Sequence, residues 1–357
     1  MNKKAVIAIP YLTGKGGTET VIKNFSRALN VRNTNKNISW KLVSFWGTKY
    51  PEWLSGWNKT VYNFTESRSI QLIAYIFLLP FLVAHVLKKE KSDFFIATNP
   101  IIWTLAFKFK KKVSPNTQVI AWYHYSFKMK KVKRRYLSCA DKFWAISSGI
   151  QEELLSVGVS SKKIDLVYNP VPTANVKTIP RSHKQNHFIY IGRIDYDGQK
   201  NVSELIKAFN KLKGDWHCDF YGSITLETKK KLLNIASKKT MNNISFKGFY
   251  DDVWNHIEKA DALILTSKYE GFPMVLCEAA SRGVSIISSD CPMGPKEIIN
   301  NNGYLYMPGD IKQLIFLLNQ IVSSKIILPS PKQVKESVQK FDYKKYAVRI
   351  YSSLNLN

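Results

Sequence analysis

Acidic side chains are scarce in this sequence. Its 357 residues include 26 Asp and Glu against 53 Lys and Arg, which gives a net charge of +27. The imbalance is concentrated in the first half, where 27 basic and 9 acidic residues precede position 171 and give a net +18. A field of this sign attracts polyanions, so it favours nucleic acid, an anionic membrane surface or a phosphorylated substrate as partner.

Cysteine is also scarce, and no two cysteines form a C-x-x-C pair. The four residues are Cys139, Cys218, Cys277 and Cys291. This number and spacing argue against a disulfide framework or a zinc site and favour a reducing cytoplasm. The first apolar run is short and leads into a glycine loop instead of a small-residue cleavage site, so we expect no signal peptide.

Long apolar runs are nearly absent, and the one exception covers 18 residues at 70–87. That length is at the lower limit for a membrane-spanning helix, and the run contains Gln71, Pro80 and His85. We interpret it as a buried helix of the first domain. The alternative is a helix that partly meets the bilayer interface.

Elsewhere, short apolar runs of strand character alternate with stretches of helical character. In the first block we expect a helix at 18–29, a helix capped by Ser147 or Ser148, and strands at 4–11, 39–45, 94–98, 118–122, 142–146 and 164–168. Residues 171–186 are polar and contain prolines, as is typical of a linker.

The alternation then restarts. We expect strands at 187–191, 216–221, 244–246, 262–266 and 284–288, and helices at 202–212, 273–282, 311–323 and 343–354. Such alternation predicts the α/β class, with parallel sheets and right-handed crossovers. We therefore predict two doubly wound Rossmann-like domains, 1–170 with the C-terminal helix 342–357, and 186–340. Ligands of such sheets bind beyond the carboxyl ends of the strands, which favours a site in the cleft between the blocks.

The strongest local motif is EGFPMVLCE at 270–278, directly after a predicted strand. Pro273 suits the first turn of a helix, where its missing N–H is not needed. Two carboxylates eight helical steps apart, Glu270 and Glu278, are separated by about 12 Å. That exceeds the about 5–9.5 Å of a glycosidase pair and matches the distance from hexose to ribose in a nucleotide sugar. Free N–H groups around 272–275 would face the diphosphate between them.

Two cations form the second constellation. Arg193 ends the first strand of the second block, and Lys200 follows seven residues later, before a predicted helix capped by Asn201. Cations at the carboxyl edge of a sheet would offset the charge that grows on a departing nucleoside diphosphate.

Two weaker signals lie in the first block. The loop GKGGTE at 14–19 lacks the spacing of a dinucleotide fingerprint and the Lys-Ser/Thr of a P-loop. Gly16 and Gly17 would nonetheless let the backbone approach a bound sugar or phosphate. His124 follows a predicted strand, where a contact to a sugar hydroxyl is one reading and a structural histidine the other.

An apparent metal motif is also present. Asp195 and Asp197 imitate a D-x-D site, but they lie in the loop between the two cations. We interpret them as a solvated loop and predict no metal and no other cofactor.

Taken together, these residues resemble glycosyltransferase family 4, whose members have the GT-B fold of two Rossmann-like domains facing across a cleft. The resemblance covers nearly the whole chain and rests on Gly16, Gly17, His124, Gly192, Arg193, Lys200, Glu270 and Glu278. The E-x7-E pattern with EGFP inside it is specific, whereas the glycine loop alone is not. One departure is that YGSI at 221–224 has a single glycine, Gly222, where relatives often have Gly-x-Gly, so the backbone there would approach the nucleotide differently.

The resemblance implies a role for each matching residue. Glu270 would contact hexose hydroxyls, Glu278 the ribose hydroxyls, and His124 the C6 hydroxyl of the sugar. Arg193 and Lys200 would hold the diphosphate. The implied catalytic set is Glu270, His124, Arg193 and Lys200, and the implied donor-binding set is Gly16, Gly17, Arg193, Lys200, Gly222, Glu270, Gly271, Phe272, Pro273, Met274, Val275 and Glu278.

Further segments resemble family members that transfer galactose from UDP-galactose to a glucose of the lipopolysaccharide core in an α-1,6 linkage with retention. These segments are AISSGI at 145–150, VYNPV at 167–171, DGQK at 197–200, TS at 266–267, SSDC at 288–291 and GP at 294–295. The implied partners are a UDP-sugar, a lipopolysaccharide core acceptor and an anionic membrane surface, with no specific nucleic acid. The implied location is the cytoplasm, peripheral on the cytoplasmic face of the inner membrane.

A phosphate-rich acceptor in an anionic membrane would give the basic clusters of the first block a use. The lysines at 108 and 110–112 form one cluster. We assign to acceptor or membrane binding the other, which follows His124 and comprises Lys128, Lys130, Lys131, Lys133, Arg134 and Arg135.

Three alternatives stay open. One is the same fold acting with UDP-glucose or UDP-N-acetylglucosamine on another cell-surface glycan. A non-hydrolysing nucleotide-sugar epimerase shares the fold, but the E-x7-E spacing argues against it. A basic nucleic-acid-binding protein is permitted by the charge, although no helix-turn-helix, zinc-finger or RNA-recognition signature is present.

Overall fold

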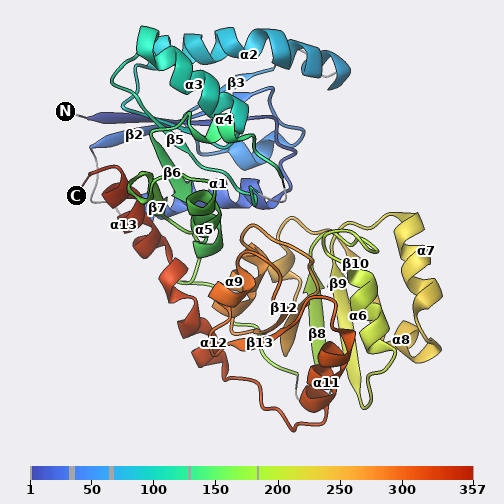
Figure 1. The fold of residues 1–357 in the computed structure, drawn as a ribbon. Helices are drawn as coiled ribbons and strands as arrows, with labels where there is room; N and C mark the ends of the chain where they lie inside the picture. Colours follow the sequence, from blue (N-terminus) through green and yellow to red (C-terminus); the bar gives the residue numbers. More distant parts are fainter. Residues whose placement is uncertain (1, 32–36, 64–67, 128–129, 183–184, 357) are drawn as a thin grey trace. The chain divides into compact units, whose positions relative to one another are not determined.

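The computed structural model describes residues 2–31, 37–63, 68–127, 130–182 and 185–356 (Figure 1). The chain divides into two compact units. Unit 1 comprises Met1–Pro170 and Tyr343–Asn357, and unit 2 comprises Val171–Asp342. Each unit is built on one parallel sheet with helices packed against it, so the predicted α/β class with two Rossmann-like domains is confirmed.

The sheet of unit 1 has seven strands in the order β3-β2-β1-β4-β5-β6-β7, and neighbouring strands are parallel. The strands are β1 (Lys3–Ile9), β2 (Ile38–Phe45), β3 (Lys59–Tyr62), β4 (Phe94–Ala97), β5 (Gln118–Ala121), β6 (Lys142–Ala145) and β7 (Ile164–Leu166). Strand order reverses between β1 and β4, and the carboxyl ends at such a switch point form the usual ligand crevice of a doubly wound sheet. The glycine loop after β1 begins at this point.

The helices of unit 1 are α1 (Gly17–Val31), α2 (Arg68–Glu90), α3 (Pro100–Val113), α4 (Arg134–Leu137), α5 (Ser148–Ser156) and α13 (Tyr343–Ser353), with short 3-10 turns η1 (Pro51–Leu54) and η2 (Ser161–Lys163). Side-chain oxygens cap two of them, since Asn99 accepts from the first turn of α3 and Ser147 from Ile150 N of α5. The apolar face of α1 brings Phe25 against Trp122, with ring centroids 5.2 Å apart.

The last helix, α13, packs against α1 of unit 1. Tyr343 donates a hydrogen bond to Asn24 at 2.9 Å, and the indole of Trp144 donates to Ser353 Oγ at 2.7 Å. Tyr346 is fully buried, with its ring 5.9 Å from Phe25. The C-terminal residues therefore complete the core of the unit that the N-terminus begins.

The sheet of unit 2 has six strands in the order β10-β9-β8-β11-β12-β13, again with parallel neighbours. They are β8 (Asn186–Ile191), β9 (Trp216–Tyr221), β10 (Ile244–Gly248), β11 (Ala262–Leu265), β12 (Ser285–Ser289) and β13 (Gly303–Tyr306). Here the order reverses between β8 and β11. The loops that leave these two strands at their carboxyl ends contain Arg193, Lys200 and Glu270.

The helices of unit 2 are α6 (Val202–Phe209), α7 (Leu226–Ile235), α8 (Lys238–Asn243), α9 (Met274–Ser281), α10 (Pro295–Ile298), α11 (Ile311–Val322) and α12 (Pro331–Ser337), with 3-10 turns η3 (Val253–Asn255) and η4 (Gln339–Phe341). Aromatic side chains join helix and sheet, since Phe209 of α6 stacks on Trp216 of β9 at 4.5 Å. Both side chains are fully buried. This packing attaches the C-terminal end of α6 to the sheet.

The linker prediction for 171–186 is wrong for the residues that the structure describes there. Val171 and Ile179 are fully buried, and Val171 pairs with Asp342 in an isolated bridge. Ile179 N donates to Arg282 O at 3.0 Å. Polar composition suggested a solvated connection, but these scattered apolar residues attach the segment to unit 2.

The sequence analysis did not predict two of the strands, β3 and β13, for different reasons. β3 lies at the edge of its sheet and reads KTVY, with no fully buried residue. β13, GYLY, begins with Gly303, where a side-chain Cβ would lie 2.0 Å from the carbonyl oxygen of Ile286. A glycine inside a strand weakens the sequence pattern, yet here it permits close pairing with β12.

The expectation that 70–87 is a buried helix holds for one face only. Leu79, Val83 and Val86 of α2 are buried, whereas Phe77 and Phe81 are 67% and 74% exposed. Hydropathy is high on both faces, so the sequence did not reveal which face is covered. No helix within the described residues is long and apolar enough to cross a bilayer.

Candidate functional site

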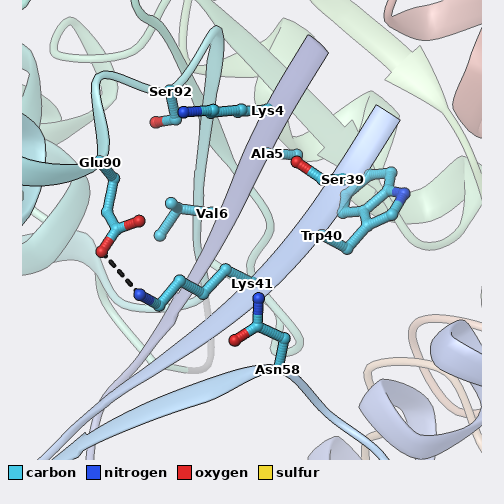
Figure 2. Close-up of a pocket in the computed structure, with 9 residues that line it drawn as sticks. All are labelled: Lys4, Ala5, Val6, Ser39, Trp40, Lys41, Asn58, Glu90 and Ser92. Carbon is cyan, nitrogen blue, oxygen red and sulfur yellow. Dashed lines mark hydrogen bonds and ion pairs between the residues drawn. The ribbon is translucent and has the colours of Figure 1, made fainter. Parts of the chain in front are cut away.

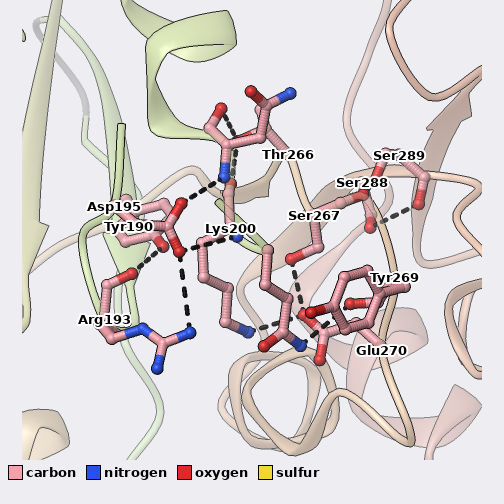
Figure 3. Close-up of polar contacts among 12 residues, drawn as sticks. Tyr190, Arg193, Asp195, Lys200, Thr266, Ser267, Tyr269, Glu270, Ser288 and Ser289 are labelled. Atoms are coloured by element: carbon pink, nitrogen blue, oxygen red, sulfur yellow. Dashed lines mark hydrogen bonds and ion pairs between the residues drawn. The ribbon is translucent and has the colours of Figure 1, made fainter. Parts of the chain in front are cut away.

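The loop after β11 carries a buried carboxylate. Glu270 is 7% exposed and its Oε1 accepts hydrogen bonds from Lys200 Nζ and Ser267 Oγ, each at 2.6 Å (Figure 3). Its backbone N–H donates to Pro292 O at 3.2 Å, which ties the loop to the segment after β12. Lys200 and Glu270 come from the two strands that flank the switch point, so the parallel topology brings them together.

A second carboxylate shapes the Lys200 loop. Asp195 accepts hydrogen bonds from the backbone N–H groups of Lys200, at 3.1 Å, and Asn201, at 2.9 Å. Asp197 bonds the hydroxyl of Ser203 at 2.5 Å. The D-x-D pair therefore acts as a structural clamp within its own loop. Asp197 is exposed, as the interpretation as a solvated loop expects, whereas Asp195 is half-buried. All three hydrogen bonds join residues five or six positions apart, and the D-x-D spacing alone does not reveal them.

Thr266, the residue after β11, also holds the backbone of the Lys200 loop. The hydroxyl of Thr266 donates to Lys200 O at 2.9 Å and to Asn201 O at 3.1 Å. Asn201 is the N-cap residue of α6, as predicted, but it has a left-handed φ of 50° and its side chain makes no capping bond. The ammonium of Lys200 is thus presented by a rigid loop.

The side chain of Arg193 is more exposed to solvent than that of Lys200. Its side chain is 64% exposed, with a guanidinium nitrogen 3.8 Å from Asp195 Oδ2. Its carbonyl oxygen accepts a hydrogen bond from the buried hydroxyl of Tyr190 at 2.9 Å. The backbone is anchored while the guanidinium faces solvent, an arrangement suited to bidentate capture of an anion.

A thiol lies in the same neighbourhood but is unsuited to nucleophilic chemistry. Burial raises the pKa of Cys291 to about 12, and the nearby charge of Glu270 adds to this effect. A thiol with that pKa is protonated at neutral pH, and only the thiolate is a strong nucleophile. The chemistry of this site therefore rests on Lys200, Arg193 and Glu270.

Glu278 lies within α9 and has a partner that the sequence did not indicate. Its Oε2 accepts a hydrogen bond from the indole of Trp254 at 3.0 Å. Burial raises the pKa of Glu278 above its usual value, while that bond and the charge of Arg282 oppose the shift. The Arg282 guanidinium lies 4.6 Å from the Trp254 ring centre. Trp254 stands in a 3-10 turn 24 residues upstream of Glu278, a separation that no short motif captures.

The residues between Glu270 and Glu278 form the start of α9 and pack against the rest of unit 2. α9 begins at Met274, with Pro273 at the N-cap position and not inside the first turn as predicted. Phe272 is buried, with its ring 5.2 Å from Phe341. Gly271 and Val275 are half-buried. Leu276 N donates to Pro273 O at 3.0 Å. No side chain caps the N–H groups of Met274 and Val275, the first two residues of α9, and uncapped N–H groups at a helix start can bind an anion.

Gly222 is required by close backbone packing. Its φ is +153°, and a Cβ there would lie 1.8 Å from Gly192 O, at the end of the neighbouring strand. The two glycines thus let the carboxyl ends of β8 and β9 approach each other. Gly222 N donates to Gly248 O at 2.8 Å.

In unit 1, a buried carboxylate organises the glycine loop. Glu19, 5% exposed, accepts hydrogen bonds from Gly14 N at 2.9 Å and Thr13 Oγ1 at 3.2 Å. A Cβ at Gly16 would meet Glu19 Oε2 at 2.6 Å, whereas a Cβ at Gly17 would meet nothing within 4 Å. A side chain at position 16 would therefore displace the Glu19 carboxylate that organises the loop.

His124 is buried without a hydrogen-bond partner among the described residues. Both ring nitrogens are inaccessible and unbonded there, and the ring lies 4.6 Å from that of Trp122. Burial lowers the pKa of His124 to about 3, so the imidazole is neutral at physiological pH. The following loop is anchored by Glu153, which accepts from Ser126 Oγ at 2.7 Å and Phe127 N at 2.8 Å. A buried unpaired imidazole is costly unless a ligand satisfies it.

The comparisons with known proteins decide the family. Residues 15–175 match the family described as Glycosyltransferase Family 4, and residues 173–341 match Glycosyl transferases group 1. A lipopolysaccharide 1,6-galactosyltransferase of Escherichia coli K12 is 32% identical, over 95% of this chain and 94% of that protein. The chain is a family 4 glycosyltransferase.

Other relatives agree with this family assignment. A lipopolysaccharide 1,6-galactosyltransferase of Salmonella typhimurium is 31% identical over 88% of each chain. The apo structure of the lipopolysaccharide outer core galactosyltransferase WaaB superposes with a TM-score of 0.83, at 27% identity, over 99% of both chains. A UDP-glucose complex of Anabaena HepE, at 16% identity and a TM-score of 0.77 over 98% and 99% of the chains, shares the fold. The GT-B expectation is confirmed.

The structure distributes the predicted glycosyltransferase residues over both units. Gly16, Gly17 and His124 belong to unit 1, and the remaining predicted donor-binding residues belong to unit 2. Within unit 2, Arg193, Lys200 and Glu270 converge, whereas Glu278 lies at the other end of its motif with Trp254. Among the described residues, no group of three or more His, Cys, Asp or Glu side chains is placed to hold a metal ion.

The predicted basic cluster after His124 is largely exposed where the structure describes it. Lys128 lies outside the described residues. Lys130 places its ammonium 3.2 Å from the ring centre of Tyr125. The remaining members, all exposed, are Lys131, Lys133, Arg134 and Arg135.

One cavity of unit 1 lies away from these residues. It has a volume of about 170 Å³ and is lined by Lys4, Ser39, Lys41, Glu90 and Ser92 among others (Figure 2). An ion pair of 2.7 Å between Lys41 and Glu90 crosses it. Its lining residues include the amino end of β1 and Ser39 near the start of β2, opposite the edge where doubly wound sheets bind ligands.

Proposed function

We propose that this glycosyltransferase transfers galactose from UDP-galactose to a sugar of the lipopolysaccharide core, in an α-1,6 linkage and with retention of configuration. The observation that carries the proposal is the 32% identity to a lipopolysaccharide 1,6-galactosyltransferase over 95% of the chain. The Lys200–Glu270 pair at the switch point of unit 2 supports it, since it supplies the charges that a nucleotide-sugar donor requires.

Lys200 and Arg193 hold the diphosphate of the donor. The ammonium of Lys200 is paired with Glu270 at 2.6 Å, and the Arg193 side chain is 64% exposed. A diphosphate carries two or more negative charges, so it attracts both cations. As the bond to the sugar breaks, charge grows on the departing UDP, and fixed cations stabilise that state more than the ground state.

These two cations also support a reaction that needs no metal ion. Positive charge beside the diphosphate can come from a divalent cation or from side chains. We assign this role to Arg193 and Lys200, assisted by the uncapped N–H groups at the start of α9. EDTA is therefore expected to leave turnover unchanged.

Glu270 and Glu278 bind the two sugars of the donor. Glu270 is placed by Ser267 and Lys200, so its second carboxylate oxygen is available to hexose hydroxyls. Glu278 is held by Trp254 and binds the ribose hydroxyls. Carboxylates are strong acceptors for sugar hydroxyl groups, and both are oriented by a donor within 3.0 Å.

The roles of His124 and the glycine loop, both in unit 1, are carried over from the family. The unpartnered nitrogens of His124 are suited to the C6 hydroxyl of the donor sugar, because a neutral imidazole can both donate and accept. Gly17 has open space around it, which permits backbone approach to a ligand.

Retention follows from attack on the face that the UDP leaves. We propose that a phosphate oxygen of the departing UDP takes the proton of the acceptor hydroxyl as the new glycosidic bond forms. Glu270, under the reacting sugar, stabilises the positive charge that develops there. No covalent enzyme intermediate is required.

We further propose that the enzyme works in the cytoplasm, at the cytoplasmic face of the inner membrane. Two observations support this location. The similar protein of Escherichia coli is named as a lipopolysaccharide galactosyltransferase, and residues 1–170 of this chain carry a net charge of +18. Anionic membrane surfaces attract such a segment.

The test is UDP release from UDP-galactose, UDP-glucose and UDP-N-acetylglucosamine, with and without truncated lipopolysaccharide core, in EDTA. Galactose-selective release that depends on the acceptor supports the proposal. Selectivity for another sugar refutes the galactosyl assignment, and acceptor-independent release of an epimerised sugar refutes transfer.

A further inference from the structure

The outer face of α2 is apolar and exposed. Six large side chains of this helix are between 41% and 74% exposed, and these are Ile70, Ile73, Ile76, Phe77, Leu78 and Phe81. Isolated apolar residues are common on surfaces, but a contiguous group of this size marks an interaction site.

The exposed residues form a stripe along one side of the helix. Ile70, Ile73, Phe77 and Phe81 are separated by three or four positions, which places them on the same face. From Ile70 to Phe81 the stripe is about 16 Å long, at 1.5 Å per residue. We call these residues, with Ile76 and Leu78, the α2 stripe.

The opposite side of α2 is already used. Leu79, Val83, Val86 and Leu87 are at most 2% exposed and attach the helix to unit 1. Tyr75 donates a hydrogen bond to Asn99 at the start of α3, at 3.4 Å. The helix is thus fixed by its inner face, and the α2 stripe is not needed for folding.

Basic residues extend the line of the stripe. Lys88 lies seven positions after Phe81, on the same face of the helix, and Lys89 and Lys91 follow it. All three are exposed. α2 precedes β4 and α3 follows it in a parallel sheet, so the two helices run in the same direction and end at the same edge (Figure 1).

The end of α3 adds to this charge. Lys108, Lys111 and Lys112 are exposed there. The acidic groups of this edge are neutralised, because Glu90 pairs with Lys41 at 2.7 Å and Asp141 with Lys110 at 2.5 Å. The edge therefore carries uncompensated positive charge beside an apolar stripe.

We propose that the α2 stripe docks unit 1 on an anionic phospholipid surface, with α2 lying in the plane of the interface. An apolar face that continues into lysines is the pattern of an interfacial helix. The apolar side chains enter the acyl boundary while the lysines contact lipid phosphates. Pro80 and the buried inner face are consistent with a helix that lies on the bilayer and does not cross it.

This surface differs from the basic cluster after His124, to which the sequence assigned membrane binding. That cluster has charge, and one of its lysines is engaged over Tyr125. The α2 stripe adds an apolar contribution, which salt does not screen. The inference rests on the proposed function only in that a lipid-borne acceptor requires a membrane-facing surface.

The test compares two double variants, each of which replaces two exposed apolar side chains, in flotation with vesicles of phosphatidylglycerol and phosphatidylethanolamine. Phe77→Ser with Phe81→Ser removes the centre of the α2 stripe. Phe316→Ser with Ile327→Ser is the control, because these residues of unit 2 are 60% and 85% exposed. We expect the stripe variant to lose about tenfold or more in vesicle affinity, and the control to bind as the wild type does.

Two further measurements separate the alternatives. Thermal unfolding and UDP release with a soluble truncated core are expected to match the wild type in both variants. Their failure would concern folding or the proposed function and not the membrane surface. Vesicle binding by the stripe variant equal to wild type overturns the inference, as does a wild-type dimer that the variant dissociates with vesicle binding unchanged.

Discussion

The Lys200–Glu270 pair allows the two sides of the donor site to be tested separately. Glu270→Gln keeps the shape of the side chain and its bond to Ser267, but removes the charge that neutralises Lys200. Lys200→Met removes the ammonium and keeps the length of the side chain. If Lys200 binds the diphosphate and Glu270 the hexose, the two variants must differ in which step they impair.

The magnitudes follow from burial. The Glu270 and Lys200 side chains are 8% and 17% exposed, and the joining atoms are 2.6 Å apart. Removing one partner of a fully buried pair costs about 3–5 kcal/mol. Since Lys200 retains some access to water, we expect each variant to lose about 1–3 kcal/mol of unfolding free energy.

UDP affinity and turnover should respond differently in the two variants. In Glu270→Gln the ammonium of Lys200 is released to the diphosphate, so UDP affinity stays equal or rises while kcat falls by about 10²–10³. In Lys200→Met, UDP affinity itself falls by about tenfold or more, as expected for a charge-assisted bond worth about 1.5–3 kcal/mol.

The assay is calorimetric titration with UDP beside steady-state turnover of UDP-galactose. The control pair is Lys231 and Glu227 on α7, which are also 2.6 Å apart but 56% and 78% exposed. Lys231→Met and Glu227→Gln should change neither stability nor turnover, because exposed pairs contribute little. If Glu270→Gln and Lys200→Met lose UDP affinity equally, the separate roles are wrong.

Four further outcomes are expected. Burial alone would raise the pKa of Asp219, but hydrogen bonds from two histidines outweigh it and lower that pKa. The contribution of Asp219 to stability is therefore present above the unfolded pKa and declines as pH falls below about 4. In Asp219→Asn, the melting temperature should depend less on pH in this range. Gly222→Ala should lower the unfolding free energy by more than about 2 kcal/mol and should lower UDP affinity. The control Gly248→Ala has open space around it and should cost about 1 kcal/mol. Equal losses of stability in the two variants would contradict the packing argument. His124→Gln should lower turnover without changing the pH–rate profile between about pH 5 and 8, since the histidine stays neutral there. Trp254→Phe should weaken UDP binding by about threefold to tenfold, and unchanged affinity would remove Trp254 from the donor site.

The sequence was sufficient to predict that Arg193, Lys200 and Glu270 lie at one edge of the sheet, because parallel topology makes them converge. A residue just after β8 and another just after β11 must lie at the same edge of the sheet, whatever the intervening chain does. The motif around Glu270 and the cations before α6 are both short and local. Alternation of strands and helices was enough for the fold class.

The partners of these residues could not be predicted in this way. Trp254 reaches Glu278 from a different element, and Asp195 acts through the backbone N–H groups of its own loop. Glu19 and Glu153 are buried carboxylates that hold loops in place, yet in the sequence they read as ordinary surface glutamates. Such contacts depend on the packing of whole elements, and no spacing rule encodes them.

The two faces of α2 show the same limit from another side. A continuous apolar run does not distinguish a helix covered on both faces from one covered on a single face. The structure makes the distinction through Val83, which is fully buried, and Phe81, which is 74% exposed. Composition gave the net charge of unit 1, but only the fold shows where that charge is uncompensated.

The central claim is retaining transfer of galactose to a core sugar, and the product tests it most directly. The measurement is a proton NMR spectrum of the product formed from UDP-galactose and truncated lipopolysaccharide core in the presence of EDTA. The account predicts one new galactosyl residue with an α anomeric coupling and a linkage to a C6 oxygen of the acceptor. A β-linked galactose, a linkage to another carbon, or free galactose without a glycosidic product would contradict it.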